Sequence, residues 1–297
     1  MKSNRTGSNS PVVWILTLIL IVQALLVLYP ICFTVSASFT KSNSLASTSI
    51  VPLPLSHTVD KATGESFTKF APSLLQYKRL FTETQYINWY KNTLIVACMN
   101  TIITVILCTL TGYIFSRFIF PFRKPIMASM IILQMFPSFI GMIATYVILW
   151  KLNALNTLWG LVLVYSTGSI PFNSWLMKGY FDTISKDIAE AAYIDGATPF
   201  EAFIKVIVPS AKPQIVFLSL TSFTGPWMDF IFPKLILRSD DKKTLAVGLY
   251  EMISGRSADK FTMFAAGALL VAVPFTILFV SGQKTLLQSL AGTGGKE

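Results

Sequence analysis

The chain has 297 residues, of which 53% are hydrophobic and only 13% are charged, and its mean hydropathy is +0.60. Soluble globular domains carry about 25% charged residues, so this composition excludes an ordinary soluble protein and indicates one that crosses a membrane several times. The formal net charge of +10 is not accompanied by an aromatic and basic nucleic-acid motif. We therefore expect no nucleic-acid partner.

Several stretches of the sequence are long and apolar enough to span a bilayer, which takes about 20 residues. Helices are the expected form, because backbone N–H and C=O groups find no water partner in hydrocarbon. The sequence therefore predicts an all-α polytopic membrane protein with six transmembrane helices. They are expected over roughly 12–36, 93–116, 125–150, 158–177, 214–231 and 261–280.

The first stretch could also be a cleaved signal peptide, since Lys2 and Arg5 precede it and small residues follow it. Its apolar run is well beyond the roughly 7–15 residues that signal peptides use. A retained membrane anchor is therefore the expected form of residues 12–36.

Basic residues in the short loops predict the orientation of the chain. The link between the second and third stretches holds Arg117, Arg123 and Lys124 and no acid, whereas the next link holds only Lys151. Because cytoplasmic loops are rich in Lys and Arg, the first of these links is expected in the cytoplasm. Both termini and the polar segment 179–213 then lie on the cytoplasmic side as well.

The residues needed for metal, redox or nucleotide chemistry are scarce. All three cysteines fall in predicted spans, and His57 is the only histidine. A phosphate-binding loop needs GxxxxGK followed by Ser or Thr, and the two nearest strings, at 282–285 and 294–297, lack that spacing or the final hydroxyl. We expect no metal site, no cofactor bound by this chain and no enzyme activity of its own.

The predicted spans contain hydroxyl and amide groups but almost no ionisable ones. Ion-coupled carriers usually place ionisable residues at membrane depth, and the nearest candidate, Asp229, is expected to be solvated near the outer end of the fifth stretch. Polar side chains in spans either line a hydrated path for an uncharged, polyhydroxyl solute or hold helices together, and both interpretations stay open. The candidates for lining such a path are Asn100, Ser166, Thr167, Asn173 and Ser222.

The polar segment 179–213 carries the patterns of two short helices. Ser185 is a suitable cap for a helix over about 186–193, and Gly196 permits a tight turn. Thr198 and Glu201, with proline between them, form a capping box that predicts a helix over about 199–208, ending at Pro209. Two short helices and a turn make a compact knob, which is either a docking surface or only a connection.

The same segment contains Glu190-Ala191-Ala192, then Gly196, then Val206, Val208 and Pro209. This spacing resembles EAA–x3–G–x9–I–x–L–P, the cytoplasmic signature of bacterial binding-protein-dependent ABC importer permeases, with Val in place of Ile and Leu. The strings at 133–146, 195–203 and 244–250 resemble the sugar-transporting branch. Most of the chain, from about Thr93 onward, is similar to the smaller permease subunit of maltose-type importers.

The resemblance implies a type I ABC importer permease fold with a cytoplasmic coupling helix. It also implies partners: a second, larger permease subunit, two cytosolic ABC ATPase subunits that hold ATP and Mg, an extracellular or periplasmic solute-binding protein, a sugar substrate and membrane lipid. The expected location is the bacterial cell membrane, multi-pass, with both termini in the cytoplasm. The residues implied in contact with the ATPase are Glu190, Ala191, Ala192, Asp195, Gly196, Ala197 and Pro209.

The resemblance also implies three parts of the chain. Residues 1–86 would hold the cytosolic N-terminus, the first transmembrane helix and a long extracellular loop, and residues 87–282 would form the core permease domain with five transmembrane helices. The cytosolic tail 283–297 would enter the ATPase dimer interface. A loop over about 251–260 would reach the binding protein through Glu251, Ser254, Gly255 and Arg256.

The resulting hypothesis is a permease subunit that forms half of the path of an ATP-driven carbohydrate importer. One alternative is an importer of the same family for a non-sugar solute. The other is an ion-coupled secondary carrier, which the scarcity of charge in the spans disfavours.

Overall fold

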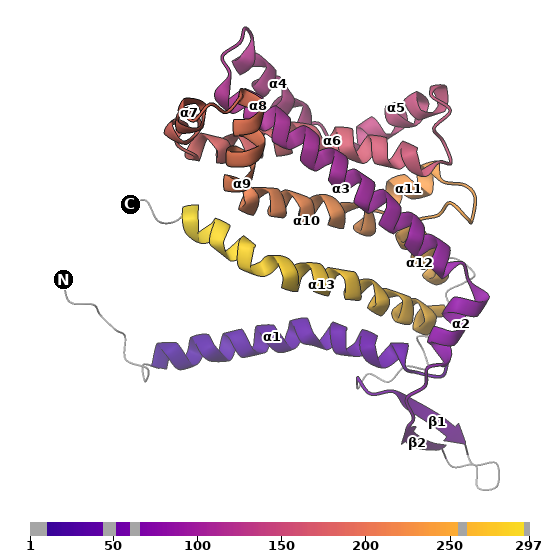
Figure 1. The fold of residues 1–297 in the computed structure, drawn as a ribbon. Helices are drawn as coiled ribbons and strands as arrows, with labels where there is room; N and C mark the ends of the chain where they lie inside the picture. Colours follow the sequence, from indigo (N-terminus) through magenta and orange to yellow (C-terminus); the bar gives the residue numbers. More distant parts are fainter. Residues whose placement is uncertain (1–10, 44–51, 60–65, 255–259, 294–297) are drawn as a thin grey trace. The chain divides into compact units, whose positions relative to one another are not determined.

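The computed structural model describes residues 11–43, 52–59, 66–254 and 260–293. These residues are mainly helical (Figure 1). The chain divides into two compact units, one of Met1–Thr84 with Leu249–Val271 and the other of Gln85–Gly248 with Ala272–Glu297.

The first unit begins with α1 (Pro11–Ser38), a helix that is apolar on every side. None of its most hydrophobic 18-residue window is buried within the chain, as expected for a helix that faces lipid or another membrane protein. A hairpin follows, in which β1 (Leu55–Val59) pairs antiparallel with β2 (Ser66–Phe70). The all-α class is confirmed for the described chain as a whole, and this hairpin is a local exception whose short strands lie in the polar region after the first span.

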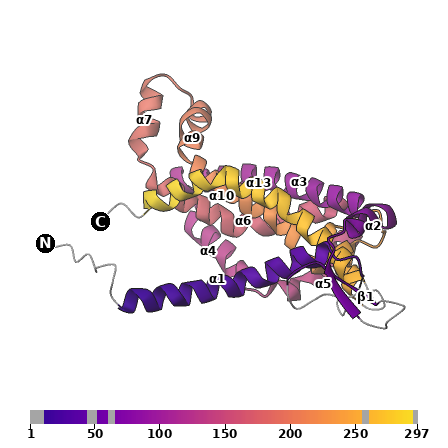
Figure 2. The same ribbon diagram turned by 90° about the horizontal axis from the view of Figure 1, so that it is seen from below.

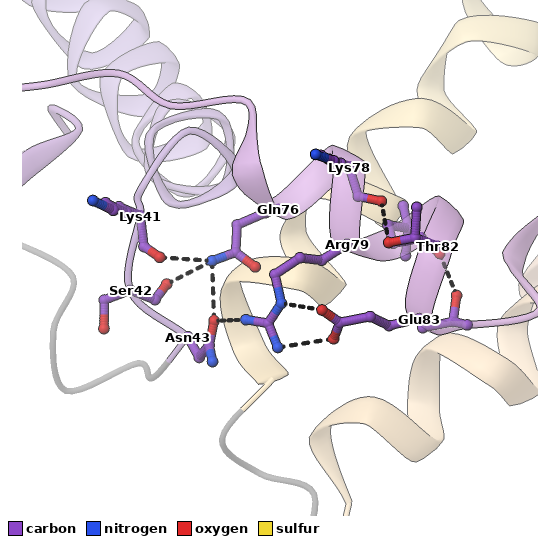
Figure 3. A network of polar contacts seen from close by, with 10 residues as sticks. Lys41, Ser42, Asn43, Gln76, Lys78, Arg79, Thr82 and Glu83 are labelled. Carbon is purple, nitrogen blue, oxygen red and sulfur yellow. Dashed lines mark hydrogen bonds and ion pairs between the residues drawn. The ribbon is translucent and has the colours of Figure 1, made fainter.

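Helix α2 (Leu75–Glu83) fixes the segment that leaves α1 (Figure 3). Gln76 is fully buried, and its amide donates to the backbone carbonyls of residues 41 and 42 at 3.1 and 3.0 Å and to the side chain of Asn43 at 3.2 Å. Arg79 donates to the same Asn43 oxygen and, through two nitrogens, to Glu83 at 2.8 and 2.9 Å. Thr262 adds a hydrogen bond to the carbonyl of residue 42 at 2.6 Å.

The second unit is built around α3, α6 and α10, which pack side by side (Figure 1). Gly112 allows α3 and α6 to approach closely, because a Cβ there would lie 2.6 Å from the Cβ of Met177. The helices of this unit are α3 (Tyr86–Arg117), α4 (Arg123–Gln134), α5 (Ser138–Lys151), α6 (Leu158–Thr183), α7 (Lys186–Ile194), α8 (Pro199–Ala202), the π-helix η2 (Phe203–Ile207), α9 (Val208–Ser210), α10 (Lys212–Met228) and α11 (Ile231–Ile236). Two further helices, α12 (Leu245–Ile253) and α13 (Phe261–Thr293), contribute residues to both units.

One buried amide joins the three central helices of this unit. Asn100 on α3 is 2% exposed, and its Nδ2 donates to the carbonyl of Ser222 on α10 at 2.8 Å. Its Oδ1 accepts from Ser166 on α6 at 3.2 Å and from Thr104 on its own helix at 3.3 Å. Both ends of the amide are therefore satisfied in the interior, where an unpaired polar group would be costly.

The first turns of α3 hold the segment before α12. Trp89 Nε1 and Asn92 Nδ2 donate to the backbone carbonyls of residues 240 and 241 at 3.1 and 2.8 Å, and Thr93 Oγ1 accepts from the N–H of Leu245 at 2.8 Å. Gly248 lies against the Trp89 ring so closely that a Cβ would come within 2.2 Å of it. This glycine is therefore needed for the indole to pack there.

By length and composition, the described helices provide three to five candidate membrane spans. Three are long and apolar enough by themselves, namely α1, α3 and residues 261–283 of α13, and two bent pairs, α4 with α5 and α8–α9 with α10, bring the number to five. Helix α6 has 26 residues, long enough to cross, but polar side chains lower its hydropathy. The described helices therefore give three to five candidate spans, and a sixth span in α6 stays a prediction.

The third predicted span, 125–150, is not one continuous helix. Helix α4 ends at Gln134 and α5 starts at Ser138, with Pro137 between them. Proline has no N–H and disfavours a helical conformation in the residue before it, which explains why the helix stops here. The prediction of one uninterrupted span was wrong because the apolar run continues through the break.

Candidate coupling site and family

Residues 185–211, here called the knob, stand off from the packed helices of the second unit. Figure 2 shows α7 and α9 projecting from the end of that bundle, beyond α6 and α10. The helix formed by α8, η2 and α9 meets α10 at 77°. Both short helices of the knob were predicted from the sequence, and both are present.

Helix α7 begins and ends on the residues that the sequence indicated. Ser185 accepts a hydrogen bond from the N–H of Asp187 at 3.3 Å, and the acid lies in the first turn, where the helix dipole favours it. At the other end, Gly196 has φ +88°. Its N–H donates to the carbonyl of Tyr193 at 3.0 Å, and the next N–H, of Ala197, donates to the carbonyl of residue 192 at 2.9 Å. These two bonds form a Schellman motif.

The capping box of α8 is present in full. Glu201 N–H donates to Thr198 Oγ1 at 3.3 Å, and Thr198 N–H donates back to the Glu201 carboxylate at 3.1 Å. This backbone bond, followed by the Lys205 ammonium at 3.0 Å, lowers the pKa of Glu201 to about 2. A depressed carboxyl pKa contributes stability that is present above the ordinary value and is lost as the pH falls through the folded one. The cap therefore stays intact through neutral and mildly acidic pH.

The second helix of the knob does not stop at Pro209, which corrects the sequence prediction. Residues 203–207 form a π-helix, in which Val208 N–H donates to the carbonyl of Phe203, five residues earlier. Helix α9 then continues through Pro209 to Ser210. Proline interrupts the regular i to i−4 pattern, and the wider π-turn just before it lets the helix continue, as π-bulges do elsewhere.

The knob is joined to the membrane helices by an aromatic cluster. Phe203 of η2 lies 4.5 Å, centroid to centroid, from Tyr113 of α3, and Tyr113 also meets Phe181 at the end of α6 at 5.9 Å. Ala189 of α7 and Ile207 of η2 are buried in the same cluster. We call these five residues the root of the knob.

Polar contacts close the end of α6 beside this root. Arg117 of α3 donates from Nη2 to the carbonyls of Phe181 and Ile184 at 3.1 and 2.7 Å, which satisfies groups left free where the helix ends. Asp182 accepts from Ser116 at 2.7 Å and pairs with Lys178. The junction of α3, α6 and the knob is therefore tied by both packing and charge.

The predicted ATPase-contacting residues lie on the outer side of the knob. Glu190, Ala191, Asp195, Gly196 and Pro209 are exposed, and Ala192 and Ala197 are half-buried. The Glu190 carboxylate makes no hydrogen bond or ion pair with the described residues, so it is available to a partner. The knob also exposes large apolar side chains, which mark an interaction surface, namely Ile188, Tyr193, Ile194, Phe200 and Ile204.

Sequence reasoning did not identify the root. Ala189 directly precedes the signature acid and looked like one more small residue, yet it is the residue of α7 that faces inward. Tyr113 lies in a predicted span, 90 residues along the chain from Phe203, and no local pattern links the two. Only the capping signals around residues 185–201 were readable without a structure.

The candidate path-lining residues separate into two groups. Asn100, Ser166 and Ser222 are enclosed between α3, α6 and α10, so the structure places them in helix–helix contact, the alternative role considered for them. Thr167 is exposed, and Asn173 is half-buried, with Nδ2 donating to the carbonyl of residue 169 at 3.0 Å. These two remain candidates for contact with a solute.

A mainly apolar cavity of about 400 Å³, with Thr145, Tyr165 and Asp229 as its polar lining, lies between α5, α6 and α11. Tyr165 donates from its hydroxyl to Asp229 Oδ2 at 2.9 Å, and Asp229 Oδ1 accepts from the N–H groups of Ile231 and Phe232 at 3.0 and 3.3 Å. Asp229 was expected to be solvated at the interface. It instead caps α11 and forms part of the cavity wall. The sequence signal for this site was an acid within a predicted span.

The loop and tail predictions meet the structure only in part. Glu251 lies within α12 and is half-buried, so it is not in a loop, because the apolar pattern of 245–253 continues as a helix past it. Ser254 follows directly, whereas Gly255 and Arg256 lie outside the described residues. Residues 283–293 continue α13, and the last four residues of the predicted tail are outside the described part of the chain.

The sequence model of one protein family, the binding-protein-dependent transport system inner membrane component, matches residues 108–286. The chain belongs to this family. That stretch includes the whole knob, its root and the cavity beside Asp229.

Relatives of this permease match nearly the full length of the chain. The chain is 38% identical over 279 residues to the maltodextrin transport system permease protein MdxG of Bacillus subtilis, and 37% identical over 282 residues to the galactooligosaccharides transport system permease protein GanQ of the same organism. Each alignment covers 94% of both chains. The resemblance to the permease subunits of maltose-type systems is thereby confirmed.

The fold agrees with that of a solved transporter. A chain of the bacterial ABC transporter involved in the import of the acidic polysaccharide alginate superposes with a TM-score of 0.76, covering 94% of this permease and 98% of that chain. The sequence identity is 21%, so this likeness concerns the fold alone. The type I importer permease fold predicted from the signature is confirmed.

The turn of the knob should depend on glycine at residue 196. In Gly196→Ala, the side chain has room but the positive φ costs an L-residue roughly 1–2 kcal/mol. Amide hydrogen exchange at residues 195–197 should therefore accelerate about tenfold. Gly179→Ala is the matched control, because this glycine also has space for a Cβ but lies in α6, where alanine is favoured. Equal exchange in both variants would contradict the assignment.

Proposed function

We propose that this chain is a permease subunit of an ATP-driven importer of carbohydrate and that its solute is an oligosaccharide. The chain forms half of the path across the membrane. The observation that carries the proposal is the exposed knob with the family's signature acid in a chain that has no phosphate-binding loop. The relatives support the solute class, because two permeases for different oligosaccharides match almost equally well.

The driving force comes from two cytosolic ATPase subunits, which hold ATP and Mg themselves. Shifting a two-state equilibrium from 1:99 to 99:1 takes about 5.5 kcal/mol of differential binding. One exposed ion pair through Glu190 contributes about 0–1 kcal/mol, so apolar contacts must supply most of the coupling. The exposed Ile188, Ile194, Phe200 and Ile204 are suited to this task, with the small Ala191 allowing close approach.

The knob faces the cytoplasm of a bacterial cell, and both termini lie on that side. Arg117 is bonded to the end of α6 next to the knob, so the basic link 117–124 and the knob share one end of the second unit. Lys151 belongs to the opposite end, where α5 runs into α6. The enrichment of basic residues in cytoplasmic loops then favours this orientation.

The remaining partners follow from an importer of this family. A second, larger permease subunit completes the path and covers apolar helix faces such as that of α1, and a solute-binding protein delivers the sugar from the outside. Within this chain, the cavity with Tyr165 and Asp229 offers acceptors for sugar hydroxyl groups. Phe139 and Phe232 in its lining supply apolar surface for a sugar ring.

Two alternatives make different predictions. An importer of the same family for a non-sugar solute would keep the dependence on ATP but ignore oligosaccharides. An ion-coupled carrier is favoured by one observation, the carboxyl group of Asp229 at the edge of a predicted span. Its hydrogen bonds to two backbone N–H groups hold that carboxylate in the cavity wall, which argues against its being the site of a coupling ion.

Uptake into vesicles tests the proposal. The chain reconstituted with a second permease, ATPase subunits and binding protein should accumulate labelled maltodextrin or galactooligosaccharide when ATP is supplied, and an ionophore that dissipates ion gradients should not stop it. Concentrative uptake by this chain alone, driven by an ion gradient, would sink the proposal.

The cavity residue can be tested in the same assay. Asp229→Asn keeps an acceptor for the cap of α11 but removes the charge, and hydrogen bonds to charged groups contribute about 1.5–3 kcal/mol. The KM for uptake should therefore rise about tenfold or more, with ATP hydrolysis retained. Asp240→Asn, an exposed acid outside the cavity, is the control. An unchanged KM in Asp229→Asn would remove this residue from the path.

A further inference from the structure

A second cavity, of about 410 Å³, lies between α4 and the ends of α3 and α6 that are nearest the knob. Its volume is within the roughly 300–1,000 Å³ of ligand pockets. Its lining combines apolar side chains, Phe115, Met127 and Ile131, with three basic side chains, Arg123, Lys124 and Lys178, which we call the basic wall. A ligand that fits this lining must combine negative charge with hydrocarbon.

The basic wall carries more positive charge than its surroundings neutralise. Lys178 pairs with Asp182, which is also within electrostatic range of Arg123. Arg123 donates from Nη2 to the carbonyl of Ser116 at 3.4 Å, a long bond to an uncharged group, and neither Arg123 nor Lys124 forms an ion pair among the described residues. Helix α4, whose 12 residues start at Arg123, has no side-chain cap at its N-terminus, so the positive end of its dipole adds to the same field.

An exposed apolar tip adjoins the basic wall. In the link from α3 to α4, Ile119 is 94% exposed and Phe122 is 76% exposed, and Phe118 is also exposed. Phe122 has φ +63°, which bulky L-residues rarely adopt. Large apolar side chains held outward beside arginine and lysine are typical of a segment at the membrane interface, where the rings enter the lipid and the cations reach the headgroups.

We propose that this cavity binds an anionic phospholipid, with the phosphate held by Arg123 and Lys124 and an acyl chain along Phe115, Met127 and Ile131. Arginine is suited to the phosphate because its fork of N–H groups matches the oxygens, and basic pockets between membrane helices bind such headgroups elsewhere. Asp182 and Ser116 adjoin both the cavity and the root of the knob. A bound lipid would therefore brace the joint that the knob depends on. This proposal does not rest on the transported solute.

Thermal unfolding of the full chain tests this site. The purified protein in neutral detergent is titrated with phosphatidylglycerol, with phosphatidylcholine and with inorganic phosphate, and the midpoint concentration for stabilisation is measured. Phosphatidylglycerol should stabilise at much lower concentration than either of the others. In Arg123→Gln with Lys124→Gln, its midpoint should rise roughly thirtyfold, about fivefold for each charge.

Controls separate the site from general effects of charge and folding. Lys151→Gln removes a basic residue at the far end of α5 and should leave the midpoint unchanged. Lys124→Gln alone alters one exposed side chain and should give the fivefold shift without disturbing the fold. Equal stabilisation by phosphatidylcholine or by phosphate would overturn the proposal, as would an equal shift in Lys151→Gln. Loss of ATPase binding with an unchanged lipid midpoint would show instead that the basic wall docks a protein.

Discussion

The contact between Tyr113 and Phe203 is the interaction on which the rest of the structure depends. A knob of 27 residues that projects from a helical bundle has few contacts that can hold it rigidly. Here the ring of Tyr113 on α3 lies 4.5 Å from the ring of Phe203 on η2 and 5.9 Å from the ring of Phe181 at the end of α6. Aromatic pairs of this kind contribute about 0.5–1.5 kcal/mol beyond the area that they bury. A displacement of the knob is therefore transmitted directly to α3 and α6.

The second unit has the internal stiffness to transmit such a push. Asn100 links α3, α6 and α10 through one satisfied amide, and Gly112 allows α3 and α6 to pack closely. Hydrogen bonds between membrane helices contribute about 0.6 kcal/mol on average, so the amide fixes the arrangement of the helices more than it stabilises them. Polar residues in the spans thus stabilise the helix arrangement at some positions, and only a few, such as Thr167 and Asn173, stay candidates for the path.

Much of the fold and part of the site were readable from the sequence, for physical reasons. Long apolar runs identify spans because hydrocarbon admits little else, and caps such as Ser185 and Thr198 act through residues only two or three positions away. The break at Pro137 was missed because the apolar run continues through it, and the π-turn before Pro209 was missed because proline was taken as the end of the helix. The root joins residues 90 positions apart, Tyr113 and Phe203, and no local rule connects them.

The most direct measurement is the number of sugar molecules taken up per ATP hydrolysed by the complete transporter carrying Phe203→Leu. Leucine keeps the root apolar but removes the ring contact with Tyr113. The account predicts that ATP hydrolysis continues while uptake per ATP falls severalfold, with Phe172→Leu, an exposed ring on α6, behaving as the wild type. An unchanged ratio in a folded Phe203→Leu transporter would contradict the claim that the root carries the force.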